Sequence, residues 1–162
     1  MKQIRLYNVL FPMWLLLLVP QVWLIVLPGN LLIDCTVVLL TLTALNHTQK
    51  RTVLKQIWWK VWLLGFAADF VGAATLLPVL PLMGCVSEEV RALIHPLMYN
   101  CWLSPIAVLW TAAAVAVAGV CIYLFDRWVL RFCAPLSTRE RHILALTLAV
   151  VTAPWTFFIP AY

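Results

Sequence analysis

Long apolar runs separated by short polar links make up most of this 162-residue chain. A run of about 18 or more apolar residues can cross the hydrocarbon core of a bilayer as a helix. The pattern predicts an all-α fold, a polytopic transmembrane bundle of about five spanning helices that form one domain over residues 1–162. The predicted spans cover residues 10–27, 31–45, 61–83, 105–125 and 143–160.

Local signals mark several ends of these spans. The segment 27–30, Leu-Pro-Gly-Asn, has Pro and Gly in the two central positions that a type II turn prefers, so the first two spans should form a tight helical hairpin. Ser104 and Pro105 predict a helix start, with Ser at the N-cap and Pro at the first helical position. Ser137 and Glu140 have the spacing of a capping box at the start of the last helix.

Charge is sparse and unevenly distributed. Charged residues make up 10% of the chain and hydrophobic residues 65%, whereas about a quarter of an ordinary soluble domain is charged. The net charge is +5, and the basic residues are concentrated in particular connections between the predicted spans. This distribution indicates membrane topology and no nucleic-acid partner. Ten of the eleven Lys and Arg residues fall on one side of the predicted spans, and only Arg91 falls on the other. The positive-inside rule then predicts a cytoplasmic N-terminus and an external C-terminus in a plasma or inner membrane.

The N-terminal region resembles a signal peptide in one respect, because Lys2 and Arg5 precede an apolar run. However, the run at 10–27 is long for the hydrophobic part of a signal, contains Trp14 and lacks a small-x-small cleavage site at its end. We therefore expect it to remain as the first span.

Two connections should contact the membrane surface. Residues 50–62 alternate apolar and basic positions at helical spacing, which predicts a helix on the inner leaflet. The basic positions are Lys50, Arg51, Lys55 and Lys60. These cations either bind anionic lipid or only set the topology. On the outer side, Ser87 can cap a short helix that either rests on the membrane or folds over the bundle as a lid.

Asp69 is the most informative polar residue, because it lies within the predicted span 61–83, roughly 12 Å from the inner end at 1.5 Å per residue. Intramembrane carboxylates are costly and face the bundle or a wet cavity, where they act as proton relays, ion ligands or counter-charges. The alternative is a protonated Asp69 that hydrogen-bonds to a neighbouring helix and contributes to packing.

Small residues around Asp69 predict close packing between helices. Gly65, Ala68 and Gly72 share a stripe with Asp69, and Ala68 and Gly72 have the small-xxx-small spacing of spanning-helix contacts. The Ala-rich part of the span 105–125 offers a matching surface. Its small positions are Ala112, Ala116 and Gly119. We therefore predict a contact between the third and fourth spans beside Asp69, and further association through these faces.

Asp34 is the second intramembrane acid, predicted about one turn inside the outer end of the span 31–45, with Thr41 two turns further along the same face. At that depth a carboxylate either reaches interfacial water or forms the outer mouth of a pathway.

Four prolines lie toward the outer side, where they either kink the helices or open an outward-facing cavity. They are Pro20, Pro78, Pro81 and Pro154.

The five cysteines form no redox or metal motif, since the sequence has no Cys-x-x-Cys and no Cys/His cluster with ligand spacing. Cys85 and Cys101 both lie on the predicted outer side, where an oxidising compartment would allow a disulfide between them. No metal or cofactor is expected.

Three classes of function remain open. The most concrete is translocation of an ion or small solute, with Asp69 as the proton or ion site and Asp34 at the outer mouth. The alternative is an accessory or assembly subunit of a larger membrane complex, because so few spans and acids are little machinery for autonomous alternating access. A small membrane-embedded enzyme comes third, because no nucleophile and base pair stands out.

Overall fold

The structure is a computed structural model that describes residues 20–160. Within this range the chain is an all-α helical bundle. Its elements are α2 (Pro20–Ala44), α3 (Lys50–Leu76), α4 (Val79–Cys85), α5 (Glu88–Ile94), η1 (His95–Met98), η2 (Cys101–Leu103), α6 (Pro105–Leu130), α7 (Thr138–Val151) and η3 (Trp155–Phe158). Four segments are long and apolar enough to cross a membrane, which by length and composition indicates a multi-pass membrane protein. They are Trp23–Ala44, Lys50–Cys85, Pro105–Leu130 and Thr138–Phe158.

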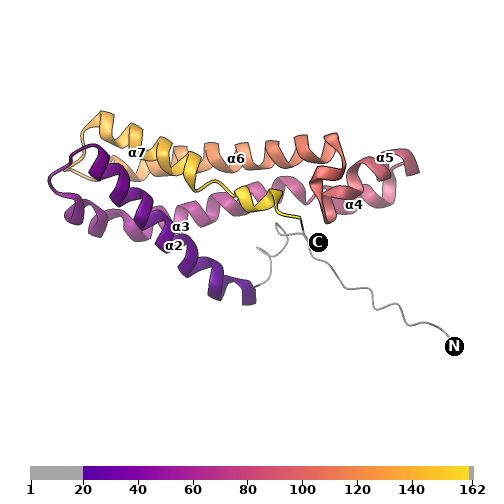
Figure 1. The fold of residues 1–162 in the computed structure, drawn as a ribbon, viewed down its shortest axis with the longest axis horizontal. Helices are drawn as coiled ribbons and strands as arrows, with labels where there is room; N and C mark the ends of the chain where they lie inside the picture. Colours follow the sequence, from indigo (N-terminus) through magenta and orange to yellow (C-terminus); the bar gives the residue numbers. More distant parts are fainter. Residues whose placement is uncertain (1–19, 161–162) are drawn as a thin grey trace.

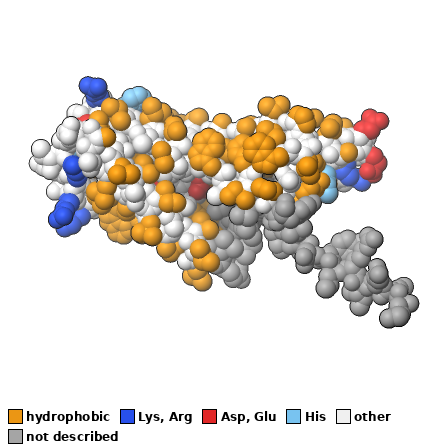
Figure 2. All heavy atoms as spheres, viewed as in Figure 1, with side chains coloured by type: hydrophobic (Ala, Val, Ile, Leu, Met, Phe, Trp, Pro, Cys, Tyr) orange, Lys and Arg blue, Asp and Glu red, His pale blue; other side chains and the backbone are white. Residues whose placement is uncertain are grey.

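Successive long helices run in opposite directions between the two ends of an elongated bundle (Figure 1). We call one end the basic end: it contains the connections 45–49 and 131–137 with the helix turns beside them, and Lys and Arg side chains gather there (blue in Figure 2). The opposite end is formed by α4, α5, η1 and η2, and acidic side chains mark its tip (red in Figure 2). The surface between the two ends is largely apolar, as lipid contact requires.

The predicted hairpin between the first two spans is wrong. Helix α2 is 25 residues long and continues through Pro28 without a break. A type II turn needs a positive φ at Gly29, and no glycine between residues 20 and 160 has one. Spanning helices tolerate an internal Pro. Beside it, the Trp62 indole of α3 donates to the carbonyl oxygen of Leu27 at 2.8 Å and ties α3 to this part of α2. The predicted span 31–45 is therefore the second half of α2, and residues 10–19 lie outside the described part of the chain.

A compact turn joins α2 to α3 at the basic end. Asn46 adopts a φ of 53°, and the N–H groups of Asn46 and His47 donate to carbonyls in the last turns of α2 at 3.0 Å, as in a Schellman motif. His47 Nδ1 lies 2.9 Å from Glu140 Oε1. Glu140 also closes the predicted capping box with Ser137, which the structure confirms. This cluster ties the α2–α3 turn to the start of α7.

Helix α3 differs from its prediction at both ends. The predicted surface helix 50–62 is not a separate element, because α3 runs continuously from Lys50 to Leu76. Helix α3 is interrupted at 77–78 and the chain continues as α4, so the predicted span 61–83 is divided between two helices. Leu77 keeps helical dihedral angles, with φ −54° and ψ −35°, so the interruption follows from the missing N–H of Pro78, which cannot donate to the carbonyl four residues earlier.

The remaining helix starts agree well with the sequence. Helix α6 begins at Pro105 with Ser104 as N-cap, as predicted, and extends beyond the predicted end at 125 to Leu130. Helix α5 begins after Ser87. Its last residue, Ile94, is buried in the apolar cluster at this end of the bundle, to which α6 also contributes, so the segment folds onto the bundle.

The predicted contact between α3 and α6 is present and is the most extensive in the bundle. Gly72 lies at its closest point. A Cβ atom at position 72 would lie 2.9 Å from Ala118 Cβ and 3.2 Å from the carbonyl oxygen of Ala114. Helix α3 therefore approaches α6 at Gly72 to a distance that only glycine allows.

The face that α6 uses for this contact differs from the predicted one. Ala112 and Ala116 are exposed, and Gly119 is turned toward α7, where the carbonyl oxygen of Ala149 would lie 3.5 Å from a Cβ at that position. Because α6 is apolar on every side, its composition gives little indication of which face is buried.

Two apolar clusters hold the helices together, one toward each end of the bundle. The cluster nearer the basic end includes Leu42, Val53, Ile57, Ala68, Leu130, Leu144 and Leu148. The other includes Phe66, Ala73, Leu76, Ile94, Ala107, Ala114 and Phe157. Along α3, Asp69 falls between Ala68 of the first cluster and Ala73 of the second, so its carboxyl group lies near the middle of the bundle.

Candidate functional site

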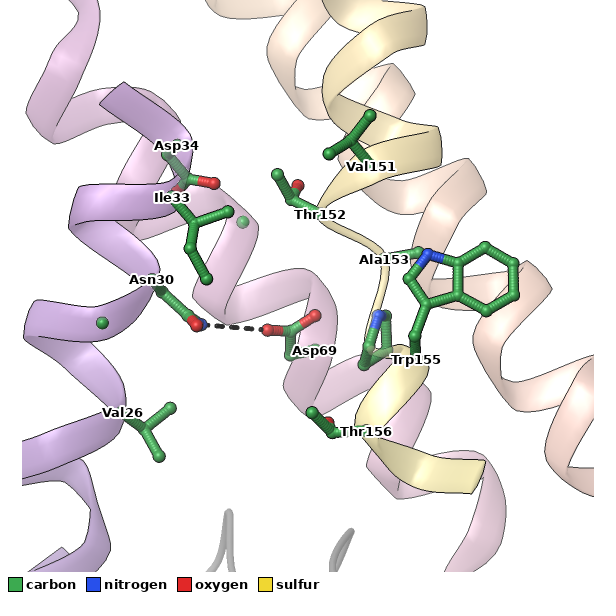
Figure 3. Close-up of a pocket in the computed structure, with 13 residues that line it drawn as sticks. Val26, Asn30, Ile33, Asp34, Asp69, Val151, Thr152, Ala153, Trp155 and Thr156 are labelled. Atoms are coloured by element: carbon green, nitrogen blue, oxygen red, sulfur yellow. Dashed lines mark hydrogen bonds between the residues drawn. The ribbon is translucent and has the colours of Figure 1, made fainter. Parts of the chain in front are cut away.

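A pocket of about 410 Å³ opens beside Asp69, between α2, α3 and the segment that joins α7 to η3 (Figure 3). The pocket brings together residues that are more than 80 positions apart in the sequence. The lining residues from α2 are Val26, Gly29, Asn30, Ile33 and Asp34, those from α3 are Gly65 and Asp69, and the third wall is formed by residues 151–156. The pocket therefore contains both acids that the sequence singled out.

Asp69 directs an unpaired carboxylate oxygen into this site. Its Oδ2 accepts a long hydrogen bond of 3.4 Å from Asn30 Nδ2 (Figure 3). Its Oδ1 is buried without a hydrogen-bond partner among the described residues, and the residue as a whole is only 7% exposed. A buried polar atom without a partner is costly, so Asp69 Oδ1 has the capacity to accept a hydrogen bond from a ligand in the pocket.

Asp34 approaches α3 at a glycine. It is 5% exposed, and a Cβ atom at position 65 would lie 3.6 Å from Asp34 Oδ2. Gly65 and Asp69 are four residues apart and therefore lie on the same face of α3. The predicted small residue Gly65 thus lies at the contact between α2 and α3, on the same face of α3 as Asp69.

Asp34 was expected about one turn inside the outer end of a span that begins at residue 31, but helix α2 has no end there. In the continuous helix α2, Asp34 lies about 15 Å from the end at Ala44, at 1.5 Å per residue, and further from the end at Pro20. Asp34 therefore lies in the middle of the candidate span Trp23–Ala44. Thr41 is buried on the same helix but does not line the pocket.

The third wall is a break in the last span. The sequence predicted a helix over 143–160, whereas α7 ends at Val151 and the chain resumes as η3 at Trp155. Pro154 has no N–H to donate to the carbonyl of Val150 four residues earlier. The Trp155 indole takes over this role and donates to Val150 O at 2.9 Å. Non-helical backbone at membrane depth is tolerated where it lines a cavity. Here the non-helical residues 152–154 line the pocket.

A third buried acid, Asp126 of α6, was missed in the sequence. It is 1% exposed, and neither of its carboxylate oxygens has a hydrogen-bond partner among the described residues. The predicted span ended at 125, which placed Asp126 in a polar connection beside Arg127. A signal was present, because Ala118, Ile122 and Asp126 continue one stripe at a spacing of four residues, and all three are buried.

No basic side chain lines the pocket or forms an ion pair with these acids in the part of the chain that the structure describes. The two ion pairs found there, His47–Glu140 and Arg91–Glu88, lie at the two ends of the bundle. The middle of the bundle therefore carries acidic groups without a counter-charge.

The other predicted positions lie away from this site. Both Cys85, which is exposed, and Cys101, which is buried, are free thiols, so the structure lends the predicted disulfide no support. The predicted lipid-binding cations lie at or near the basic end, where Lys50 Nζ donates to Thr43 Oγ1 at 3.2 Å and Lys60 lines a separate pocket of about 240 Å³. Residues 20–160 contain no cluster of His, Cys, Asp and Glu that could hold a metal ion.

Comparison with known proteins adds no assignment, because no protein-family model, no curated protein and no solved structure matches this chain.

Proposed function

We propose that this chain binds a cation in the acidic pocket and moves it across the membrane. The carrying observation is that Asp34 and Asp69, from two different spans, line one pocket that no basic residue lines. Two buried carboxylates are costly in their charged forms unless a partner compensates them. A proton or a bound cation supplies that compensation, and intramembrane acids that face a cavity are typical of ion and proton pathways.

The broken last span supports the same function. Many transporters bind their substrates near the middle of the bilayer beside discontinuous helices, where the unwound backbone exposes carbonyl groups. Here the unwound residues 152–154 face the two acids across the pocket (Figure 3). The short α7 and η3 are joined by a segment outside any helix, so they can move relative to each other at lower cost than two halves of a continuous helix.

The charge distribution supports an orientation. Lys and Arg gather at the basic end. In a plasma or inner membrane, the positive-inside rule places this end on the cytoplasmic side. Helix α7 starts at that end, and the chain therefore leaves the membrane on the outer side after η3. The predicted cytoplasmic N-terminus lies outside the described residues and stays a prediction.

Flux measurements test the proposed function. The full-length chain would be reconstituted into liposomes, and the movement of protons, of inorganic monovalent cations and of organic ammonium ions would be followed, each under an imposed gradient. We expect flux for the wild type, a loss of flux for Asp69→Asn with unchanged folding, and wild-type flux for Glu89→Gln, an exposed acid on α5. Equal flux in the wild type and Asp69→Asn would refute the proposal.

The same preparation tests the alternative function. If native mass spectrometry finds a stoichiometric foreign subunit and the chain alone supports no flux of any cation, the accessory-subunit alternative replaces the proposal. A lone chain or homo-oligomer with Asp69-dependent flux excludes that alternative.

A further inference from the structure

We infer that the cation accepted by this pocket is organic, an ammonium group attached to an apolar body, and not a bare inorganic ion. The inference rests on the proposed cation site and names the class of its ligand. Three properties of the pocket support the inference: its size, the chemistry of its walls and the exposure of its rim.

The pocket is too large for a bare ion. Its volume is about 410 Å³, whereas a water molecule occupies about 30 Å³ in the liquid and small-molecule sites span roughly 300–1,000 Å³. A hard inorganic cation also needs several oxygen ligands that close around it at about 2.0–2.6 Å. A pocket of this size instead has room for a ligand of about ten or more non-hydrogen atoms.

The walls of the pocket differ in chemistry. The α2–α3 side carries the two carboxylates and the Asn30 amide, and Asp69 points from it toward the α7–η3 segment (Figure 3). The remaining lining is mainly apolar. Its apolar members are Val26, Ile33, Val151, Ala153, Pro154 and Trp155. A few polar groups in an otherwise apolar pocket fix the orientation of a small molecule, and here they would hold the ammonium group against the carboxylates.

The rim of the pocket lies on the apolar surface of the bundle. Ile33, Val151 and Trp155 all line the pocket, and they are 51%, 51% and 53% exposed. Figure 2 shows acidic side-chain atoms at the middle of the apolar belt, far from the charged ends. A ligand with an apolar body would partition into the lipid beside this opening and reach the acids from the side.

Binding to the full-length chain in lipid nanodiscs tests the ligand class. The probe is benzyltrimethylammonium, and its control is neopentylbenzene, in which a carbon atom replaces the charged nitrogen. We expect the charged probe to bind and the neutral one to bind at least about tenfold more weakly, a difference of 1.4 kcal/mol. Asp69→Asn should weaken binding of the charged probe by a similar factor, and Glu89→Gln should leave it unchanged.

A pair of glycine variants tests the size of the ligand without removing charge. Gly29 lines the pocket, and a Cβ at this position would meet nothing within 4 Å. Gly29→Leu would therefore fill part of the pocket without a steric clash at the helix. Gly84 has the same free space but lies on α4, away from the pocket. We expect Gly29→Leu to weaken binding of the organic cation at least about tenfold, a difference of 1.4 kcal/mol, and Gly84→Leu to leave it unchanged.

The outcomes separate this inference from the proposed function. Binding that depends on charge, on Asp69 and on the space beside Gly29 supports it. If Asp69-dependent flux of protons or inorganic cations is found but benzyltrimethylammonium neither binds nor competes, the inference is overturned and the proposed function stands. If Asp69→Asn alters neither flux nor binding, both are overturned. Should Asp69→Asn fail to fold, the two leucine variants still decide the inference, because equal binding by both contradicts it.

Discussion

The close approach of α3 to α6 allows one prediction to be worked out in detail. Gly72→Ala places a methyl group 2.9 Å from Ala118 Cβ, 3.2 Å from the carbonyl oxygen of Ala114 and 3.3 Å from the Phe157 ring. Two of these neighbours are backbone or Cβ atoms, which can move only with their helix. Such overpacking costs about 1–3 kcal/mol, while replacement of Gly by Ala in a helix gains up to about 1 kcal/mol. With the full gain, the expected net loss of unfolding free energy is about 0–2 kcal/mol, which leaves Gly72→Ala about 1–3 kcal/mol less stable than an alanine variant without the clash.

Gly84→Ala is the matched control, because its methyl group would meet nothing within 4 Å. It should be as stable as the wild type or gain up to about 1 kcal/mol. Unfolding of both variants and of the wild type would be followed by Trp fluorescence during titration with a denaturing detergent, in the same mixed micelles. Equal stability of the two alanine variants would show that α3 and α6 do not meet at Gly72.

Further predictions concern the third acid, the cysteines and the basic end. Asp126→Asn replaces a carboxylate that has no partner among the described residues by a neutral amide, which is less costly to bury unpaired than a charged group, and should leave the unfolding free energy unchanged or raise it by up to about 1–3 kcal/mol; a clear loss would mean that the carboxylate has a partner. Cys85 is exposed and should react readily with a maleimide. Burial raises the pKa of the Cys133 thiol, so less thiolate is present at a given pH and its reaction should be slower and should accelerate as the pH rises; equal rates at neutral pH would contradict this. Glu140→Ala removes the capping box and the contact with His47 and should lower the unfolding free energy by about 0.5–2 kcal/mol; an unchanged unfolding midpoint would show that the cluster contributes no stability.

The sequence predicted the helical class and several helix starts because these follow from short-range patterns. The start at Pro105 and the capping box of Ser137 depend on a few neighbouring residues, and the structure has both. The hairpin at 27–30 failed for a different reason. Pro and Gly are strong turn residues in water, but in an apolar helix the alternative to helix leaves backbone groups without water to solvate them. The continuous helix therefore prevails.

The candidate site could be predicted in part. Asp34 and Asp69 are conspicuous because acids are rare in apolar segments, and the structure places both in one pocket. They come together where α2 packs against α3 beside Gly65, at which a Cβ atom would lie in ordinary van der Waals contact with Asp34 Oδ2, at 3.6 Å. The sequence showed Gly65 as a small residue but did not show which helix it would face.

Asp126 and the face of α6 could not be assigned for a related reason. When a helix is apolar on every side, hydrophobic periodicity no longer distinguishes the buried face from the lipid-facing one. Either the face of α6 with Ala112 and Ala116 or the face with Ala114 and Ala118 could be buried. The position of Gly72 on the partner helix α3 determines that the second face is buried. Asp126 follows the Ala114 stripe, so it became recognisable as a buried acid only after that face was known.

The most direct test of the central claim asks whether Asp34 and Asp69 form one cation site. Hydrophobic carbodiimides react with protonated carboxyl groups in apolar surroundings, and mass spectrometry of the digested protein locates the modified residue. We expect dicyclohexylcarbodiimide to modify Asp69, Asp34 or both in the membrane-embedded chain. An excess of the cation identified in the flux assay should reduce the modification of each residue that reacts. Modification of neither residue, or modification that no cation reduces, would contradict the existence of the site.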